Sequence, residues 1–433
     1  MISSLSGVRG VLNRDIFLSD FSRLSRNFVV ATGAAEVLVA RDSRSTGPAI
    51  SRAVAAAAMS QGADVVDYGI ISTPALFRES RTKGRAAVMV TASHNEPEFN
   101  GAKFIVGGAG IGKEVFDKVT ADALPSATAS ADGLAKPSPR PRYSDDLVSR
   151  FGAGSCEGMR VALDLGGGAA ISHSVEVLRR LGCQVFPIND SYGAFCRTID
   201  PVADDLGPLR ALVRRRVCQI GLGFDCDGDR LVVVDSEGKK RTGDFMLTLA
   251  LSEMLAETGE KKVVVSVDTT QAVDDVVEKR GGKVARSKVG EANVVGVMSQ
   301  ERARLGGEGS SGGLIDGAFN YCRDSMLAAL VIIRALKSRG TELYRQVPSY
   351  HQARLAVKVP REEAARAIRT LAREHKDADT TDGVKLWTDR HSWVLVRPSG
   401  TEDIVRVSAE AATRSGAERI ADSFAKELKE LSR

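Results

Sequence analysis

The segment Val37–Gly47, VLVARDSRSTG, decides the fold class of this chain. A short apolar strand, Val37–Ala40, runs into Asp42 and a polar loop, and an Ala-rich helical stretch and a second strand follow. Strands that alternate with helices, with a glycine after each helix, are typical of βαβ units. The segment therefore predicts an α/β domain.

The same pattern occurs twice more along the chain. Val161–Leu163 leads into Asp164, and Val263–Val267 leads into Asp268, each followed by a polar loop and a helix. We therefore expect an α/β protein with three related α/β domains that have mixed sheets. The alternative interpretation is that any α/β protein shows such similarities between its βαβ units.

The last part of the chain lacks this unit. Leu355–Val359 and Val394–Val396 are strand-like, and apolar residues between Ala417 and Leu431 recur at helical spacing. This pattern predicts a smaller C-terminal α+β domain with an antiparallel sheet. The proline-rich stretch 124–143 is typical of a linker. The domain boundaries that we expect are 1–142, 143–241, 242–348 and 349–433.

Composition excludes several classes of protein. The chain has 433 residues, 43% hydrophobic and 27% charged, as in globular proteins. Its longest apolar run, Ala53–Met59, is far shorter than the ~20 residues of a membrane helix, and its start shows no signal peptide. The net charge of +5 is scattered, and the six cysteines form no CxxC pair. We expect a cytoplasmic monomer or homodimer that binds neither membranes nor nucleic acid.

A serine follows the predicted strand Ala87–Val90, in the sequence Thr91-Ala92-Ser93-His94-Asn95. A serine exposed at a strand end can accept a phosphoryl group, and its phosphate ester is stable in water until its charge is neutralised. The segment therefore indicates a phosphoryl carrier, although an ordinary polar loop has the same composition.

Three carboxylates alternate in Asp225-Cys226-Asp227-Gly228-Asp229, between the predicted strands Ile220–Phe224 and Leu231–Val234. Because massed carboxylates repel one another and lose hydration, a hard cation such as Mg²⁺ stabilises them. We predict a magnesium site here, with a solvated acidic turn as the alternative. An EF-hand is excluded, since Gly228 is the fourth rather than the sixth residue of the loop.

A third segment, Gly306–Gly313, is rich in glycine, which lets a backbone approach a ligand closely. Glu308 and the serines at 310 and 311 could bind sugar hydroxyls. The segment also matches the GxSxG elbow of hydrolases, but Glu301–Leu305 before it is a poor strand. A flexible linker is a further interpretation.

A fourth segment, Arg397–Asp403, follows the strand Val394–Val396. Its arginine, its hydroxyls and its free backbone N–H groups suit a phosphate, together with Arg406 just beyond. An ion-paired turn is the alternative interpretation.

Taken together, these loops resemble those of the α-D-phosphohexomutase superfamily, in the same order along the chain. The resemblance includes Ser6-Gly7-Val8-Arg9-Gly10 and Asn100-Gly101-Ala102-Lys103, and it covers nearly the whole sequence. The segments Gly313-Leu314-Ile315 and Cys322-Arg323-Asp324 are most similar to archaeal-type phosphoglucosamine mutases.

The resemblance implies a heart-shaped, four-domain architecture in which the four loops meet in one cleft. It implies interconversion of hexose 6-phosphates and hexose 1-phosphates through a phosphoserine, with Mg²⁺ as cofactor and a hexose 1,6-bisphosphate as activator and intermediate. The ligand would be a phosphorylated hexose or hexosamine, with glucosamine 6-phosphate as the expected substrate. Glucose and mannose phosphates are the alternatives.

The resemblance also implies a role for individual residues. The catalytic residues would be Ser93, Arg9, His94, Lys103 and Arg230. The metal ligands would be Ser93, through its phosphate, and Asp225, Asp227 and Asp229. The substrate-binding residues would be Lys288, Glu308, Ser310, Ser311, Arg397, Ser399, Gly400, Thr401 and Arg406.

The chain departs from the family pattern at several positions. Glu96 and Asp403 replace usual prolines, and Cys226 replaces a usual glycine, without the loss of a metal ligand. Gly312–Gly313 stands where many relatives have Gly-His, and the loop is one residue longer. The sequence therefore leaves open which of the serines at 310 and 311 contacts the sugar.

Two other functions fit part of the pattern. An aspartate-nucleophile phosphatase also has Asp-x-Asp after a strand, with Asp225 as nucleophile and Asp227 as acid. A sugar-phosphate sensor would retain the cleft without turnover.

Overall fold

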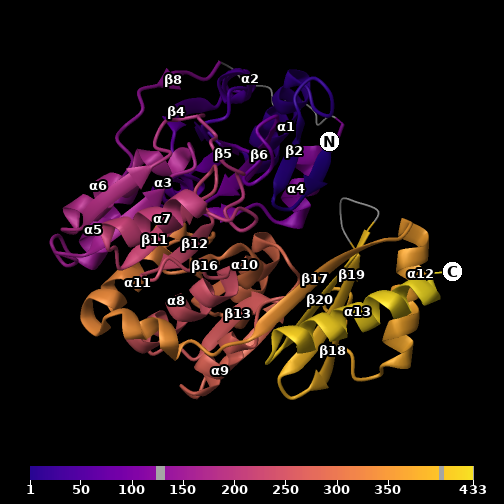
Figure 1. Ribbon diagram of the computed structural model, residues 1–433. Helices are drawn as coiled ribbons and strands as arrows, with labels where there is room; N and C mark the ends of the chain where they lie inside the picture. Colours follow the sequence, from indigo (N-terminus) through magenta and orange to yellow (C-terminus); the bar gives the residue numbers. More distant parts are fainter. Residues whose placement is uncertain (123–131, 399–403, 433) are drawn as a thin grey trace.

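The computed structural model describes residues 1–122, 132–398 and 404–432, so the predicted linker 124–143 lies partly outside the described residues. Four separate β-sheets follow one another along the chain. In Figure 1 the indigo first domain lies at the top of the molecule, the magenta second domain at the left, the orange third domain below it and the yellow fourth domain at the lower right.

The first sheet has the strand order β1-β2-β6-β5-β3-β4-β8, with β7 paired to β6. Its strands are β1 (Ile2–Ser4), β2 (Gly7–Val11), β3 (Glu36–Arg41), β4 (Asp64–Ile70), β5 (Ala86–Val90), β6 (Phe99–Val106), β7 (Ala109–Gly110) and β8 (Ala135–Lys136). Its helices are α1 (Leu18–Thr32), α2 (Gly47–Met59), α3 (Thr73–Lys83) and α4 (Lys113–Thr120). Val37 and Val39 of β3 pack in one core with α1, α2 and α4, whereas Leu38 and Ala40 pack in another with α3. Alternate side chains of a buried strand thus reach helices on opposite faces of the sheet.

The second and third domains have four-stranded sheets of identical topology. The second domain contains α5 (Tyr143–Phe151), β9 (Arg160–Asp164), η1 (Ala169–Ser172), α6 (Ser174–Arg180), β10 (Gln184–Ile188), α7 (Gly207–Arg216), β11 (Ile220–Phe224) and β12 (Leu231–Asp235). The third contains α8 (Gly243–Thr258), β13 (Lys262–Ser266), α9 (Ala272–Glu278), β14 (Lys283–Ser287), α10 (Glu291–Glu301), β15 (Leu305–Glu308), η2 (Gly309–Ser311), β16 (Gly313–Asp316), α11 (Ser325–Arg339) and η3 (Thr341–Gln346).

The repeat predicted from the sequence is present in the sheets of the first three domains. The orders β4-β3-β5-β6, β10-β9-β11-β12 and β14-β13-β15-β16 are equivalent. In each, the first three strands are parallel and the fourth is antiparallel to the third. The prediction of three related α/β domains with mixed sheets is confirmed.

The fourth domain is the predicted α+β domain. Its sheet, in the order β17-β20-β19-β18, is antiparallel throughout. Its elements are β17 (His351–Lys358), α12 (Arg361–Glu374), β18 (Val384–Asp389), β19 (Ser392–Pro398), β20 (Ile404–Ala411) and α13 (Arg414–Leu431). Ala417, Ala421 and Leu428 of α13 are buried, which confirms the predicted apolar face of the last helix.

The cores show which domains are joined. One apolar cluster runs from α3 through the second sheet to α8 and α11, and so connects the first three domains. The fourth domain has a core of its own and meets the third through a small cluster of Val267, Trp393 and Leu395. No helix in the described part of the chain is long and apolar enough to cross a bilayer.

The alternative interpretation of Gly306–Gly313 as a flexible linker is wrong, and the segment is loop only in part. Gly306 and Gly307 belong to strand β15, Gly313 begins β16, and only 309–312 connect the two strands. A Cβ atom on Gly306 would lie 2.6 Å from the Met298 sulfur, and one on Gly307 would lie 2.5 Å from a Leu247 methyl. The absence of a side chain at these glycines therefore lets helices pack closely against the strand, and it does not make the segment flexible.

Candidate active site

The third strand of the four-strand order that the α/β domains share ends at the candidate site. Strand β5 is followed by Ser93, β11 is followed by Asp225, and β15 ends at Glu308. The three domains thus use one topological position, the carboxyl end of an inner strand, to present three different chemical groups. Ligands of open α/β sheets commonly bind at such strand ends.

Ser93 lies in a strained turn. Its backbone φ is +50°, which is uncommon for a residue other than glycine. Its Oγ donates a hydrogen bond to Asp225 Oδ2 at 3.0 Å, and its backbone N–H donates to Thr91 Oγ1 at 2.8 Å. The serine hydroxyl is therefore held against the acidic loop of the second domain.

A buried arginine holds this turn in place. The Arg44 guanidinium, which has no exposed surface, donates to the backbone oxygens of Ser93 at 2.7 Å and Asn95 at 2.6 Å. It also donates to the oxygens of Glu96 and Phe99, and it pairs with the buried Asp42 at 3.1 Å. These bonds offset the strain at Ser93. Arg44 could not be found from the sequence alone, because the backbone oxygens that it binds lie about fifty residues away and share no local motif with it.

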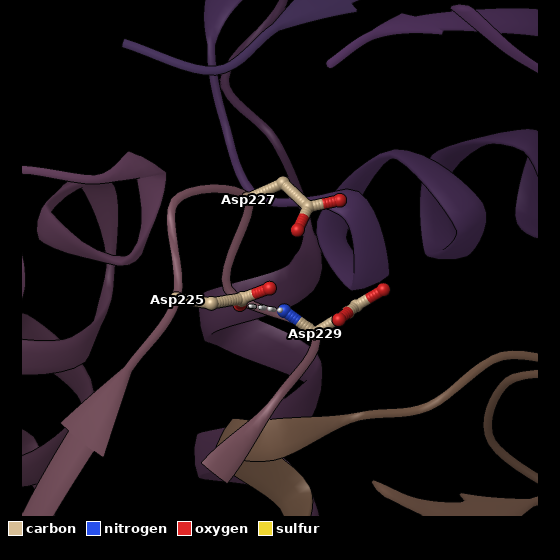
Figure 2. A group of neighbouring side chains, drawn as sticks. All are labelled: Asp225, Asp227 and Asp229. Atoms are coloured by element: carbon tan, nitrogen blue, oxygen red, sulfur yellow. Dashed lines mark hydrogen bonds between the residues drawn. The ribbon is translucent and has the colours of Figure 1, made fainter. Parts of the chain in front are cut away.

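The aspartates of the acidic loop, Asp225, Asp227 and Asp229, are completely buried. Their carboxylates converge, as Figure 2 shows. One oxygen from each lies within 4.8 Å of the others. The backbone N–H of Asp229 donates to Asp225 Oδ1 at 3.1 Å, and Gly228 has the positive φ, +68°, that the tight turn requires. Asp227 Oδ1 and Asp229 Oδ1 are buried without any hydrogen-bond partner.

Two unpartnered carboxylate oxygens beside a third carboxylate fit a hard divalent cation such as Mg²⁺, which binds oxygen ligands. Burial, together with the charges of Asp227 and Asp229, raises the pKa of the Asp225 carboxyl well above its usual value. A bound cation would therefore stabilise the ionised form of these carboxylates. The buried carboxylates, together with the Ser93 hydroxyl beside them, are consistent with the predicted metal site.

Cations from two other domains compensate part of this charge. Lys103 of β6 donates to Asp227 at 2.7 Å and to Asp229 at 2.9 Å, and Arg323, which precedes α11, donates to Asp229 at 2.8 Å. Burial alone would raise the pKa of Asp229, but Arg323 and Lys103 outweigh it and hold that pKa well below its usual range.

Glu308 binds a different nitrogen of Arg323 from the one that binds Asp229. Its Oε2 accepts from Arg323 Nη1 at 3.0 Å, and its Oε1 accepts from the backbone N–H of Gly290 at 2.6 Å. Ser311 is buried and lies within hydrogen-bond distance of the Glu308 backbone oxygen and of Arg323. Ser310 is only half-buried, so of the two serines it is the more accessible to a ligand.

Two adjacent cavities connect these groups. The first, of about 230 Å³, is lined by Ser93, Lys103 and Glu308 among others. The second, of about 490 Å³, extends to the fourth domain at Arg397 and Arg406. Five residues line both cavities, namely His94, Arg230, Val289, Ser310 and Ser311. The candidate site therefore spans all four domains.

The remaining predicted catalytic residues also line the first cavity. Arg9 Nη1 donates to Asn95 Oδ1 at 2.8 Å, and Arg230 pairs with Asp200 at 3.1 Å. His94 lies next to Ser93, with Nδ1 3.4 Å from Oγ. Burial and the nearby arginines, Arg230 first, lower the pKa of His94 to about 2, so this imidazole is neutral.

The predicted substrate-binding residues are only partly brought together. Arg397 of β19 and Arg406 of β20 face each other across the hairpin, and Arg397 lies 3.5 Å from Asp382. Ser399, Gly400 and Thr401 lie outside the described residues. Lys288 is exposed and is not among the residues that line the two cavities.

Comparison with known proteins agrees with this geometry. Models of phosphoglucomutase/phosphomannomutase match α/β/α domain I at residues 3–127, domain II at 141–238, domain III at 242–352 and the C-terminal domain at 355–427. A probable phosphoglucosamine mutase of Methanopyrus kandleri is 33% identical over 435 residues, which cover 97% of this chain and 96% of that protein. The chain belongs to the phosphoglucomutase/phosphomannomutase family.

Other relatives extend this result. A probable phosphoglucosamine mutase of Methanothermobacter thermautotrophicus is 31% identical, over 96% of this chain and 95% of its own. The crystal structure of a family protein from Burkholderia thailandensis superimposes with a TM-score of 0.87 at 25% identity, over 100% of this chain and 98% of that one. The four-domain fold class and the assignment as a phosphohexomutase, an isomerase, are confirmed.

The acidic loop generates a prediction about metal binding. Asp227→Asn keeps the size of the side chain but removes a charge from the buried cluster, so Mg²⁺ affinity should fall by at least tenfold. Isothermal titration calorimetry of the purified protein measures this affinity. Asp205→Asn, at an exposed carboxylate of the same domain, is the matched control and should bind Mg²⁺ as wild type does. Equal affinity in both variants would contradict the assignment of Asp227 as a ligand.

Proposed function

We propose that this phosphohexomutase converts glucosamine 6-phosphate to glucosamine 1-phosphate through phosphorylated Ser93 and a 1,6-bisphosphate. The observation that carries the proposal is the position of Ser93. Its hydroxyl lies 3.0 Å from a buried carboxylate of the aspartate cluster, and the residue also lines the cavity that contains Glu308. The curated relatives named above, both probable phosphoglucosamine mutases, support glucosamine as the sugar.

The geometry favours this reaction over an aspartate-nucleophile phosphatase. Asp225 has no exposed surface and is not among the residues that line the cavity, whereas Ser93 is. Both carboxylate oxygens of Asp225 already accept hydrogen bonds, from Ser93 and from backbone N–H groups. Ser93 is therefore the group that a phosphate ester in the cavity can reach.

In the proposed mechanism, phosphorylated Ser93 transfers its phosphoryl group to the free hydroxyl of a sugar 6-phosphate. The bond from Ser93 Oγ to phosphorus breaks as the new ester bond forms, and the proton that the sugar hydroxyl loses is balanced by the proton that Ser93 Oγ gains. The bisphosphate then reorients in the cleft, and its other phosphoryl group returns to Ser93. Arg9 and Lys103, which line the cavity next to Ser93, would stabilise charge on the reacting oxygen.

A divalent cation held by Asp225, Asp227 and Asp229 would stabilise negative charge on the transferring phosphoryl group. A solved structure of similar fold is that of an Aspergillus fumigatus N-acetylphosphoglucosamine mutase in complex with GlcNAc-6P and magnesium, with a TM-score of 0.57 and 16% identity over 83% of this chain and 92% of that one. That complex supports magnesium as the cation for this chain.

The fourth domain would hold the phosphate that is not being transferred. Arg397 and Arg406 line the far cavity, at the opposite end of the site from Ser93. A sugar bound between the two ends could present either of its phosphorylated positions to Ser93. Ser399, Gly400 and Thr401, between these arginines in the sequence, would complete the phosphate site.

The first prediction of the proposed function concerns the phosphoryl carrier. Ser93→Ala should abolish turnover and leave the fold intact, because the side chain makes one hydrogen bond to another domain and packs no core. Intact-mass spectrometry should find a phosphorylated fraction in the wild type and none in the variant. Ser45→Ala, which removes an exposed hydroxyl from a nearby loop, should keep full activity. Full activity of Ser93→Ala would refute the phosphoserine mechanism.

The second prediction concerns the sugar. Among glucosamine, glucose and mannose 6-phosphates, glucosamine 6-phosphate should give the highest kcat/KM in an assay of the isomerised product. A higher value with mannose or glucose phosphate would replace the glucosamine assignment with phosphomannomutase or phosphoglucomutase activity. No isomerised product from any of the three would favour a sensor without turnover.

The third prediction concerns the phosphate site. A hydrogen bond to a charged group contributes about 1.5–3 kcal/mol, so Arg397→Ala should lower kcat/KM by one to two orders of magnitude. Release of free bisphosphate in single-turnover experiments should rise, since the intermediate is held less firmly. Arg390→Ala, at an exposed position of the same domain, is the control. Unchanged kcat/KM and unchanged release would exclude Arg397 from the phosphate site.

A further inference from the structure

A second glutamate lines the cavity that contains Ser93 and Glu308. Glu291 is the first residue of α10 and directly follows Gly290, whose N–H binds Glu308. Neither the loop motifs nor the family resemblance implied a role for it. Its position places a second carboxylate beside the predicted sugar-binding loop.

Only one oxygen of the Glu291 carboxylate binds another residue in the described part of the chain. Its Oε2 accepts a hydrogen bond from the backbone N–H of Arg323 at 2.8 Å and lies 3.3 Å from Arg323 Nε. No described residue donates a hydrogen bond to Oε1. Glu291 therefore has one oxygen available to a ligand in the cavity.

The carboxylates around the sugar-binding loop share one arginine. Arg323 faces three carboxylates, those of Glu291, Glu308 and Asp229. Lys103 is already paired with Asp229 and its neighbour Asp227. A single guanidinium thus serves Glu291 and Glu308 together with a third carboxylate, whereas Arg9 and Arg230, the other arginines that line the cavity, bind Asn95 and Asp200. The Glu291 carboxylate can therefore accept a further, positively charged donor from a ligand.

We propose that Glu291 binds the ammonium group of a hexosamine phosphate and thereby selects amino sugars over neutral hexoses. The inference rests on the proposed function, because it names the residue behind the sugar preference. A protonated amine donates a charge-assisted hydrogen bond to Oε1, whereas the hydroxyl at the same position of glucose or mannose donates only a neutral one. If Glu291 served only to hold Arg323 in place, its loss would affect every sugar equally.

The test measures a ratio rather than a rate. In Glu291→Gln the amide oxygen can still accept from Arg323, but the charge is lost. The ratio of kcat/KM for glucosamine 6-phosphate to that for glucose 6-phosphate should fall by about 10- to 100-fold. Glu301→Gln, at the exposed far end of α10, should leave the ratio as in wild type. An unchanged ratio in Glu291→Gln would overturn the proposal while the mutase function stands.

A binding measurement separates this inference from the proposed mechanism. In the Ser93→Ala background no phosphoryl transfer can occur, so calorimetry reports sugar recognition alone. Glucosamine 6-phosphate should bind more tightly than glucose 6-phosphate, and adding Glu291→Gln should remove most of this preference. Equal binding of the two sugars to Ser93→Ala would overturn the role of Glu291. The binding preference without any turnover by the wild type would instead overturn the mutase mechanism and leave that role intact.

Discussion

The burial of three carboxylates at the end of β11 constrains the arrangement of the domains around it. Asp225, Asp227 and Asp229 have no exposed surface, and removing a partner from a buried ion pair typically costs about 3–5 kcal/mol. Their compensating cations, Lys103 and Arg323, come from the first and the third domain. These ion pairs connect the second domain to the first and to the third. The same three domains also share one apolar core.

The three α/β domains combine one topology with three kinds of chemistry. The same inner strand ends in a hydroxyl, in a group of carboxylates, and in a glutamate next to glycines. The rigid sheet determines where each loop begins, and the loop residues determine what it can bind. The fourth domain has its own core and meets the third through a small apolar cluster and through polar contacts, such as that of Lys385 with the Val267 backbone oxygen.

Local sequence patterns predicted the elements of the fold well, because their signals are short-range. The strand Ile220–Phe224 and the apolar face of the last helix depend on hydrophobic periodicity, and both were correct. Gly306 and Gly307 were assigned to a ligand-binding loop, because a glycine needed for helix packing and a glycine needed for a close approach to a ligand look the same in a sequence.

Residues that act across domains could not be found from the sequence in the same way. Ser93 and Asp225 stand next to strands and carry recognisable motifs, so they were predicted as candidates. Arg44 and Glu291 are single charged residues that bind backbone groups far away in the chain. Arg323 was noticed only as part of a family pattern, and its three carboxylate partners come from different segments. Only the folded chain shows these contacts.

The backbone at Ser93 also restricts which amino acid can present a hydroxyl there. Threonine carries an equivalent hydroxyl, but its branched β-carbon makes a φ of +50° a marked outlier. The arginine beneath the loop holds the backbone oxygens of this turn, so a bulkier residue could not relax without breaking those bonds. The exchange of serine for threonine, conservative by chemical function, is thus disfavoured by conformation at this position.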